Sequence, residues 1–444
     1  MLGPLFRRRP IAIGGFSLVL AYLVSRALTS PWPIDFKAWR AEGILFSGIL
    51  LIAAMAAAAL LALRPATLEP RLGGLDRLYG LHKQLGIAVC ALLAIHWLAD
   101  LSPKILVALD LMTPRVKSPK PTGPVSLIAS LRGPAKDLGE WAAWSMVLLL
   151  PLALWGKAIA YGLWRHVHKI FALVLVAGVF HSALLMPLEL WASPVGAATA
   201  LALSVASVAA LLSLTGRIGA RRTVRGEIVA AQRLNPHTIE LRCRLAGGWR
   251  SHSPGQFALL TLDPSEGAHP YTMASADRGD GEVSFVIKAL GDYTRRVVEQ
   301  ARPGQPVSIE GPYGRFDLPA DDSPQVWIAG GIGVTPFMAW LDQLSLSGQS
   351  RRAVDFFWCV SNTADAVRLD WLRERAAASG VRLHLIDAAR QEFLSAEHPV
   401  FAGRLEQRQV WFCGPAGLAK ALSTGLAARG LPPSAFHTEA FGFR

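Results

Sequence analysis

Six apolar stretches, each long enough to cross a lipid bilayer, occupy the first half of the chain. They cover residues 11–29, 42–63, 79–100, 141–161, 164–186 and 193–215. A bilayer core of about 30 Å needs roughly 20 helical residues to span it. In lipid, only helices and closed barrels satisfy all their backbone polar groups. The sequence therefore predicts an all-α bundle of six transmembrane helices over residues 1–216, within a multi-domain integral membrane protein.

The first apolar stretch follows Arg7, Arg8 and Arg9, as the apolar part of a signal peptide does. No A-x-A cleavage pattern follows it and further spans come after it, so we interpret it as a retained first helix. Overall, 52% of residues are hydrophobic and 17% are charged, which excludes a disordered chain. The four cysteines contain no CxxC pair, so neither a disulfide framework nor a zinc site is indicated.

The formal net charge of +13 suggests an anionic partner such as a nucleic acid. Residues 1–215, however, carry +10 of that charge, mostly beside the apolar stretches. Basic residues flank membrane spans on the cytoplasmic side, so nucleic-acid binding is not expected. The same rule places the N-terminus and the second half of the chain in the cytoplasm. We expect the membrane to be a bacterial inner or plasma membrane. The basic loop predicted at 101–140, on the outer side, departs from this pattern.

The pattern changes after residue 216. Short β-rich segments at 224–229, 238–244, 257–262 and 283–287 are separated by Gly, Pro and Asn turns, which predicts a small antiparallel β-barrel over 217–322. From residue 323 to 444, strands alternate with helical stretches, which predicts an α/β nucleotide-binding domain.

Histidines within two of the spans are candidate metal ligands, because ionisable residues are costly there and are usually functional. His82 and His96 lie on the third span, and their spacing corresponds to about 21 Å along a helix and about 40° around it. His168 and His181 lie on the fifth span. Facing histidines on two helices can supply both axial ligands of a haem. The alternative for any single histidine is a hydrogen bond to a neighbouring helix.

The fifth span leaves one assignment open. His168 and His181 lie on nearly opposite sides of an ideal helix, whereas His166 and His181 are about 60° apart. Helix geometry alone therefore favours His166. At the outer ends of the spans, Arg40 is a candidate partner for a haem propionate or an anionic product. Its alternative is an interfacial arginine whose head group reaches water.

Three short segments in the second half of the chain, two of them containing glycine, have the residue types of cofactor-binding sites. His269-Pro-Tyr-Thr-Met-Ala-Ser275 carries an aromatic and a hydroxyl residue that suit a flavin ring. Lys288-Ala-Leu-Gly-Asp-Tyr-Thr294 ends a strand and opens a helix, where free amides bind phosphate. Gly330-Gly-Ile-Gly-Val-Thr-Pro336 also lies between a strand and a helix, although it lacks the GxGxxG spacing. Each such segment alone more often has a structural role. The order of all of them in one chain is what indicates cofactor binding.

Taken together, these motifs resemble the NADPH oxidase/ferric reductase superfamily. The resemblance covers nearly the whole chain, from His-Lys-Gln-Leu-Gly at 82–86 to the terminal Phe-Gly-Phe-Arg. It implies a six-helix domain with two b-type haems, followed by a ferredoxin-reductase-like module that binds FAD and NADPH or NADH. The family spacing of its haem ligands favours His168 over His166, and it implies the pairs His82 with His168 and His96 with His181.

The resemblance also implies roles for residues of the soluble module. FAD contacts are expected at His269, Pro270, Tyr271, Thr272, Ser275, Lys288, Gly291 and Thr294. The nicotinamide nucleotide is expected at Gly330, Gly331, Gly333, Thr335, Pro336, Cys413, Gly414 and Pro415. Phe441 is the expected aromatic shield of the flavin, and Arg40 fits the family's arginine near the outer haem.

The implied activity is electron transfer from cytosolic NAD(P)H through FAD and two haems to an outside acceptor, O2 giving superoxide. Animal superoxide-forming members carry a histidine four residues after the outer ligand, where this chain has Asp100. That departure keeps a ferric-chelate or quinone reductase as an alternative. A nucleotide-gated transporter is a remote alternative, because the histidines lie towards both membrane faces and not at the midplane. Ser361, Asn362 and Arg368 favour NADPH over NADH, since no acidic residue stands there to bind a ribose diol.

Overall fold

The computed structural model describes residues 10–29, 33–113, 126–154, 161–319, 323–347 and 353–439. The chain divides into two compact units, one ending at Ile218 and the other running from Gly219 to Phe443.

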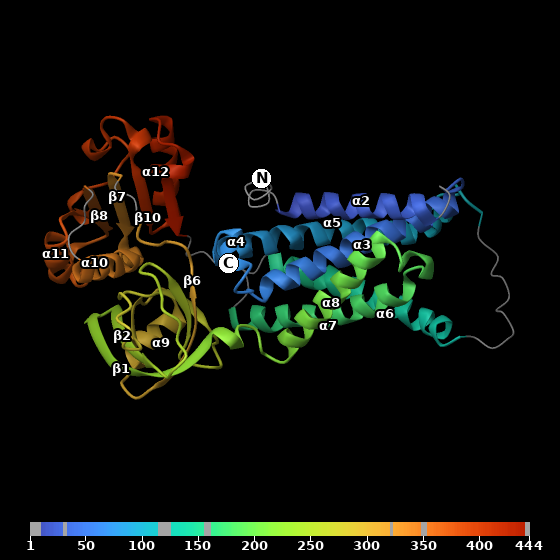
Figure 1. Cartoon of the computed structure of the whole chain (residues 1–444), viewed down its shortest axis with the longest axis horizontal. Helices are drawn as coiled ribbons and strands as arrows, with labels where there is room; N and C mark the ends of the chain where they lie inside the picture. Colours follow the sequence, from blue (N-terminus) through green and yellow to red (C-terminus); the bar gives the residue numbers. More distant parts are fainter. Residues whose placement is uncertain are drawn as a thin grey trace. The chain divides into compact units, whose positions relative to one another are not determined.

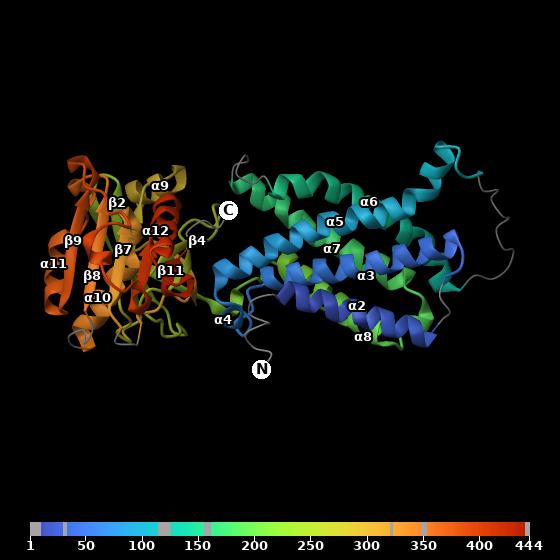
Figure 2. The same ribbon diagram turned by 90° about the horizontal axis from the view of Figure 1, so that it is seen from above.

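The first unit is all-α (Figure 1). Its helices are α2 (Pro10–Thr29), α3 (Phe36–Ala62), α4 (Glu69–Leu72), α5 (Leu75–Ala108), α6 (Leu127–Leu154), α7 (Tyr161–Leu185) and α8 (Pro194–Leu214), with a 3-10 turn η2 (Leu188–Leu190) before α8. Among the described residues, six helices are long and apolar enough to cross a membrane. The long helices run side by side in both views of this unit (Figures 1 and 2). The predicted six-helix bundle is confirmed.

Two helices extend beyond the spans that hydropathy predicts. The helix α5 continues to Ala108 and α6 begins at Leu127, so much of the predicted loop at 101–140 is helical. Hydropathy marks the part of a helix that lies in hydrocarbon, whereas a helix can continue into water with charged residues such as Lys104 and Arg132. The loop prediction was therefore wrong at both ends.

Helix α3 packs in the middle of this unit. Its buried Ile52 and Ala56 contact Leu175 of α7 and Ala206 of α8. A second cluster joins α5, α6 and α7 through buried residues such as Val89. Small residues at these contacts let the helix backbones approach closely, which is how helices associate where lipid removes the hydrophobic driving force.

The second unit begins with a six-stranded antiparallel sheet. Its strands are β1 (Thr223–Asn235), β2 (Thr238–Leu245), β3 (Phe257–Thr261), β4 (His269–Thr272), β5 (Glu282–Lys288) and β6 (Pro306–Tyr313), in the order β4-β3-β6-β1-β2-β5. A bridge between Met273 and Phe285 joins the two ends of this order and closes the sheet. Helix α9 (Asp292–Gln300) covers part of the core, packing Val297 and Val298 against it. This is the predicted antiparallel barrel.

The remainder of the unit is a five-stranded parallel sheet. Its strands are β7 (Gln325–Gly330), β8 (Val354–Val360), β9 (Val381–Asp387), β10 (Gln409–Cys413) and β11 (Phe436–Glu439), in the order β11-β10-β7-β8-β9. Helices α10 (Thr335–Ser347), α11 (Leu369–Ala378) and α12 (Ala416–Ala428) alternate with the strands. This is the predicted α/β domain, with β11 as an edge strand that the sequence pattern does not reveal.

Aromatic and polar contacts join the two sheets into one unit. Phe316, which follows the barrel, stacks on Trp340 of α10 with ring centroids 5.0 Å apart. Buried Asp342 accepts hydrogen bonds from the Ala276 amide at 3.1 Å and from Arg278 at 2.8 Å. The boundary predicted near residue 322 lies between Tyr313, the end of the last barrel strand, and Gln325, the start of the parallel sheet.

Candidate functional site

Four histidines of α5 and α7 form two pairs. The rings of His82 and His168 have centroids 6.0 Å apart, and those of His96 and His181 have centroids 6.3 Å apart. The predicted pairs are thus brought together. His166, which ideal-helix geometry favoured, is exposed. His168 and His181 need not lie on the same face of α7, because each side chain has only to reach its own partner on α5.

Backbone carbonyls of α3 orient both α5 histidines. The Nδ1 atom of His82 lies 2.9 Å from the Ala58 carbonyl oxygen, and Nδ1 of His96 lies 3.1 Å from that of Ile44. A carbonyl oxygen only accepts, so Nδ1 is the donor in each case. The neutral ring then presents the lone pair of Nε2, which is the form that binds a metal ion.

The His96–His181 pair has further support. The Ser47 hydroxyl oxygen lies 3.1 Å from Nδ1 of His96, and His181 Nδ1 lies 2.9 Å from the Ala135 carbonyl of α6. Gly139, one turn after Ala135, makes room for this ring, since a Cβ atom there would overlap His181. A Cβ atom on Gly48 would stand 3.0 Å from Cε1 of His96.

His168 is held differently. Its Nδ1 atom is buried and has no hydrogen-bond partner among the described residues. Its ring stacks on Trp164, with centroids 4.8 Å apart and 17° between the planes. Packing of the ring face, and not a hydrogen bond, therefore sets its orientation.

The chemistry of the two pairs fits haem. With a metal–nitrogen bond of about 2.0 Å, two imidazoles on one metal ion have centroids roughly 6 Å apart, close to the 6.0 Å and 6.3 Å seen here. Among the described residues, no cluster of three or more histidine, cysteine or acidic side chains is suited to a metal ion. Two-ligand sites suit a metal that brings its own remaining ligands, as haem iron does.

Arg40 lies at the end of α3 nearest the His96–His181 pair. Its Nε atom donates to the Ala99 carbonyl at 3.0 Å, and its Nη2 atom donates to the carbonyl and the carboxylate of Asp100, each at 2.8 Å. These contacts join α3 to α5 one turn beyond His96. Its predicted role beside the acceptor stays a prediction, with Asp100 as its observed partner.

In the barrel, His269, Pro270, Tyr271 and Thr272 form β4. The hydroxyls of Tyr271 and Thr272 are buried and lack a hydrogen-bond partner among the described residues. Burial raises the pKa of the Tyr271 phenol, which keeps it neutral. Buried hydroxyls without partners are rare in proteins, so these two residues fit a polar ligand such as the FAD ring. Ser275 follows the strand, and its hydroxyl accepts a bond from the Ser284 amide at 3.1 Å.

The predicted phosphate segment lies where β5 ends and α9 begins. Gly291 is the residue before the first turn of α9, whose unpaired amides and dipole favour an anion. The Thr294 hydroxyl accepts from the amides of Leu290 and Gly291 at 2.8 and 3.0 Å, so it stabilises the turn itself. Lys288 forms an ion pair with Asp365 at 3.5 Å.

The two glycine turns of the parallel sheet pack against each other. Gly330 and Gly331 lead from β7 into a 3-10 turn, η4 (Gly331–Val334), and Thr335 and Pro336 open α10. A Cβ atom at Gly330 would overlap Pro415, and one at Gly333 would overlap the Cys413 carbonyl. Glycine is therefore required there for close approach of the ends of β7 and β10.

Cys413 and Gly414 lie inside this contact. Cys413 is fully buried, and burial, with the Glu439 carboxylate as a second cause, holds its thiol pKa well above the usual range. The thiol is therefore neutral and suits a packing role beside a nucleotide better than a nucleophilic one. Glu439, paired in register with Cys413, is a residue that sequence reasoning missed. Phe441 lies outside the described residues.

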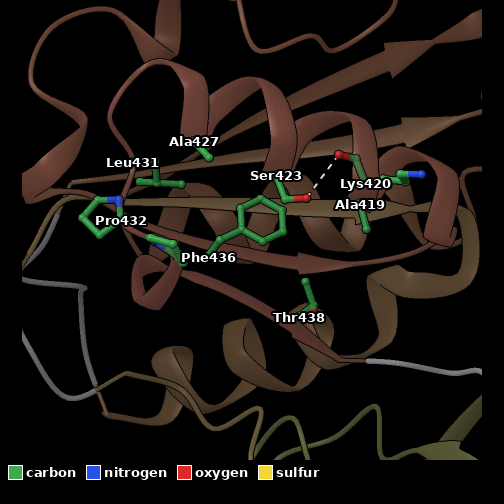
Figure 3. Close-up of a pocket in the computed structure, with 9 residues that line it drawn as sticks. Ala419, Lys420, Ser423, Ala427, Leu431, Pro432, Phe436 and Thr438 are labelled. Carbon is green, nitrogen blue, oxygen red and sulfur yellow. Dashed lines mark hydrogen bonds between the residues drawn. The ribbon is translucent and has the colours of Figure 1, made fainter.

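A separate groove of about 380 Å³ lies between α12 and β11 (Figure 3). It is lined by Ala419, Lys420, Ser423, Ala427, Leu431, Pro432, Pro433, Phe436 and Thr438. None of the predicted site residues that the structure describes lines it, so the described cofactor motifs and this groove are distinct features.

Comparison with known families gives two matches. The family model "Ferric reductase like transmembrane component" matches residues 47–179. This range includes His82, His96 and His168 but ends before His181. The model "FAD-binding domain" matches residues 224–317, which include β2 to β6 and all of β1 except Thr223.

Known proteins and solved structures are also similar to parts of this chain. The toluate 1,2-dioxygenase electron transfer component of Pseudomonas putida is 28% identical over 220 residues, covering 47% of this chain and 65% of that protein. A flavohemoprotein of Pseudomonas putida is 28% identical over 208 residues, covering 43% of this chain and 51% of that protein. A crystal structure of a ferredoxin NADP+ reductase from Neisseria gonorrhoeae matches 49% of this chain and 98% of its own, with 19% identity and a TM-score of 0.42.

The membrane helices, the barrel and the family matches define an integral membrane oxidoreductase with a flavin-binding module. This chain has a ferric reductase-like transmembrane domain followed by an FAD-binding domain, which is the architecture of the NADPH oxidase/ferric reductase superfamily. Its fold and its two domains support electron transfer through the membrane.

Proposed function

We propose that this protein transfers electrons from cytosolic NAD(P)H, through FAD and two b-type haems, to an acceptor on the outer face, with O2 giving superoxide. The observation that carries the proposal is the pairing of His82 with His168 and of His96 with His181 between the same two helices. Two such pairs at different depths provide two redox centres along one path across the bilayer.

The residues of the chain have positioning roles in this proposal. His82, His168, His96 and His181 hold the two haems, and the α3 carbonyls keep the α5 rings in the ligating tautomer. Tyr271 and Thr272 bind the flavin ring, while the start of α9 receives its pyrophosphate. Gly330, Gly331 and Gly333 admit the nicotinamide nucleotide, with Gly414 and Pro415 opposite.

Bound FAD and haem supply the redox chemistry, the flavin accepting a hydride and each haem carrying one electron. One NAD(P)H and two O2 yield NAD(P)+, one proton and two superoxide ions. Because the cell interior is negative, outward transfer is favoured by about 2.3 kcal/mol per electron per 100 mV. The arginine-rich start of the chain supports the cytoplasmic side for the soluble unit.

A ferric-chelate reductase is the second candidate, supported by Asp100. Its carboxylate is paired with Arg40, yet the Asp100 side chain is 60% exposed. An exposed carboxylate is absent from the superoxide-forming pattern and suits a cationic or metal-bearing acceptor.

The test uses purified full-length protein reduced with NADH or NADPH under nitrogen. A b-type haem spectrum that appears on reduction supports the proposal, whereas no haem signal, or no reduction by either nucleotide, overturns it. The acceptor is then identified under air and under nitrogen, with and without ferric chelate. Cytochrome c reduction that superoxide dismutase abolishes identifies O2, and oxygen-independent reduction of the chelate identifies the second candidate.

A further inference from the structure

The loop after β8 lies beside the glycine turn of β7. The two strands are parallel neighbours, and the Trp358 indole of β8 donates to the Gly331 carbonyl at 2.9 Å. In nucleotide-binding sheets, the residues at the end of the strand after the glycine turn contact the ribose 2′ position. An acidic residue there binds the 2′-hydroxyl of NADH, and a basic residue binds the 2′-phosphate of NADPH.

We propose that residues 361–368 make this enzyme prefer NADH over NADPH. The inference rests on the proposed function and specifies its electron donor. The sequence alone favours NADPH, and that expectation depended on Arg368. In the structure, Arg368 is already paired with Glu240.

Arg368 is already bonded. Its guanidinium forms an ion pair with Glu240 of β2 and donates to the Gln232 side chain of β1 at 3.0 Å. The Glu240 side chain is only 18% exposed. Moving Arg368 towards a phosphate would leave a largely buried carboxylate unpaired, which is costly.

Two further basic side chains of the described residues, on either side of the loop, are paired as well. Lys288 pairs with Asp365 at 3.5 Å, and Arg390 pairs with Asp387 at 3.8 Å. Each of these cations thus has a carboxylate partner, and the loop presents no net positive charge. A 2′-phosphate brings about −1.5 to −2 charges at neutral pH, and each of these cations would have to share it with a carboxylate.

The polar groups of the loop itself are also engaged. The Asn362 side chain accepts from the Ala364 amide at 2.9 Å. The Thr363 amide and hydroxyl donate to Asp387 at 3.0 and 2.5 Å. A ribose 2′-hydroxyl needs only a hydrogen-bond acceptor. Contrary to the expectation from sequence, an acidic residue, Asp365, lies in this loop, and its side chain is 30% exposed.

The direct test is anaerobic stopped-flow reduction of the flavin in the full-length holoenzyme, which depends on neither the haems nor the acceptor. We expect the second-order rate constant to be at least roughly tenfold higher for NADH than for NADPH. Equal constants, or a higher one for NADPH, overturn the preference alone. No flavin reduction by either nucleotide overturns the proposed function as well.

The matched variants are Ser361→Arg and Thr424→Arg. Ser361 is exposed and directly follows β8, whereas Thr424 is exposed on α12. Adding an unpaired cation at the loop should raise the NADPH rate constant roughly tenfold and leave the NADH constant within about twofold. Thr424→Arg adds the same charge elsewhere and should leave the ratio unchanged. If Ser361→Arg leaves the ratio unchanged while its melting temperature matches that of the parent, the loop is not the 2′ site.

Discussion

The His96–His181 pair and the His82–His168 pair come from the same two helices, yet their imidazoles are oriented by different means. In the first pair, both Nδ1 atoms lie within 3.1 Å of backbone carbonyls, and Ser47 adds a hydroxyl. In the second, within the described part of the chain, only His82 has such a partner, while His168 stacks on Trp164.

This difference separates two centres that ligand identity alone would make equivalent. A hydrogen bond from Nδ1 to a carbonyl makes the imidazole a stronger donor to the metal. Stronger donation stabilises the oxidised, more positive state. We therefore expect the site of His96 and His181 to have the lower reduction potential. Five substitutions, two of them with matched controls, can test how the two sites differ.

Removal of one ligand should have the largest effect. His181→Leu and His168→Leu should each lose one haem of two, so that the haem-to-protein ratio falls by about half in either variant, with the other site intact. Spectroscopic haem quantification checks this. An undiminished ratio in either variant would show that the histidine removed is not a ligand.

Gly139→Ala should disturb only the His96–His181 site. A methyl group at this position overlaps the His181 ring, although alanine otherwise stabilises a helix by roughly 0.5–1 kcal/mol over glycine. We expect that site to lose haem or change its spectrum while the His82–His168 site is unchanged.

Gly133→Ala is the control on the same helix, since a Cβ atom there meets nothing within 4 Å. Equal spectra for both glycine variants would contradict the arrangement of His181 against α6.

Ser47→Ala should produce a smaller, selective shift. Loss of one neutral hydrogen bond to Nδ1 should change the equilibrium constant for reducing that haem roughly three- to tenfold, in favour of reduction. Potentiometric titration resolves the two sites. Ser145→Ala, which removes an exposed hydroxyl on α6, serves as the control. A shift of the other site, or of both equally, would refute the assignment.

Asp100→Asn should have the smallest effect. The ion pair with Arg40 is 2.8 Å long but its carboxylate is 60% exposed, and exposed pairs stabilise a protein by about 1 kcal/mol or less. We expect a small decrease in melting temperature and no change in either haem spectrum. Loss of the His96–His181 spectrum would show that the pair is required to hold α3 against α5.

Much of the fold could be predicted from sequence because the signals are local. Apolar length predicted the six helices, and β-rich segments separated by turns predicted the barrel and the alternating sheet. Helix ends were predicted less well, since α6 begins at Leu127 and not near residue 141. Charged residues can continue a helix beyond the hydrocarbon, and hydropathy does not record that.

Site residues recognisable by their type could be predicted from sequence. The hydrogen-bond and packing partners of those residues could not. His82, His96 and the glycine turns are visible in the sequence. The carbonyls of Ile44 and Ala58 are not, because every residue has one and only packing selects which accepts. Gly139 looked like any helical glycine. The pairing of Arg368 with Glu240 joins residues 128 positions apart, which one sequence without structure does not reveal.

The contacts between α3 and α5 also restrict how this chain can change length over evolution. Ile44 and Ala58 are 14 residues apart, as are His96 and His82, which they orient. One residue inserted between Ile44 and Ala58 would turn one carbonyl by about 100° and move it about 1.5 Å along the axis. Such an insertion is tolerated only with a matching one between His82 and His96. The two segments are therefore expected to keep a common length among descendants, while the connecting loops vary freely.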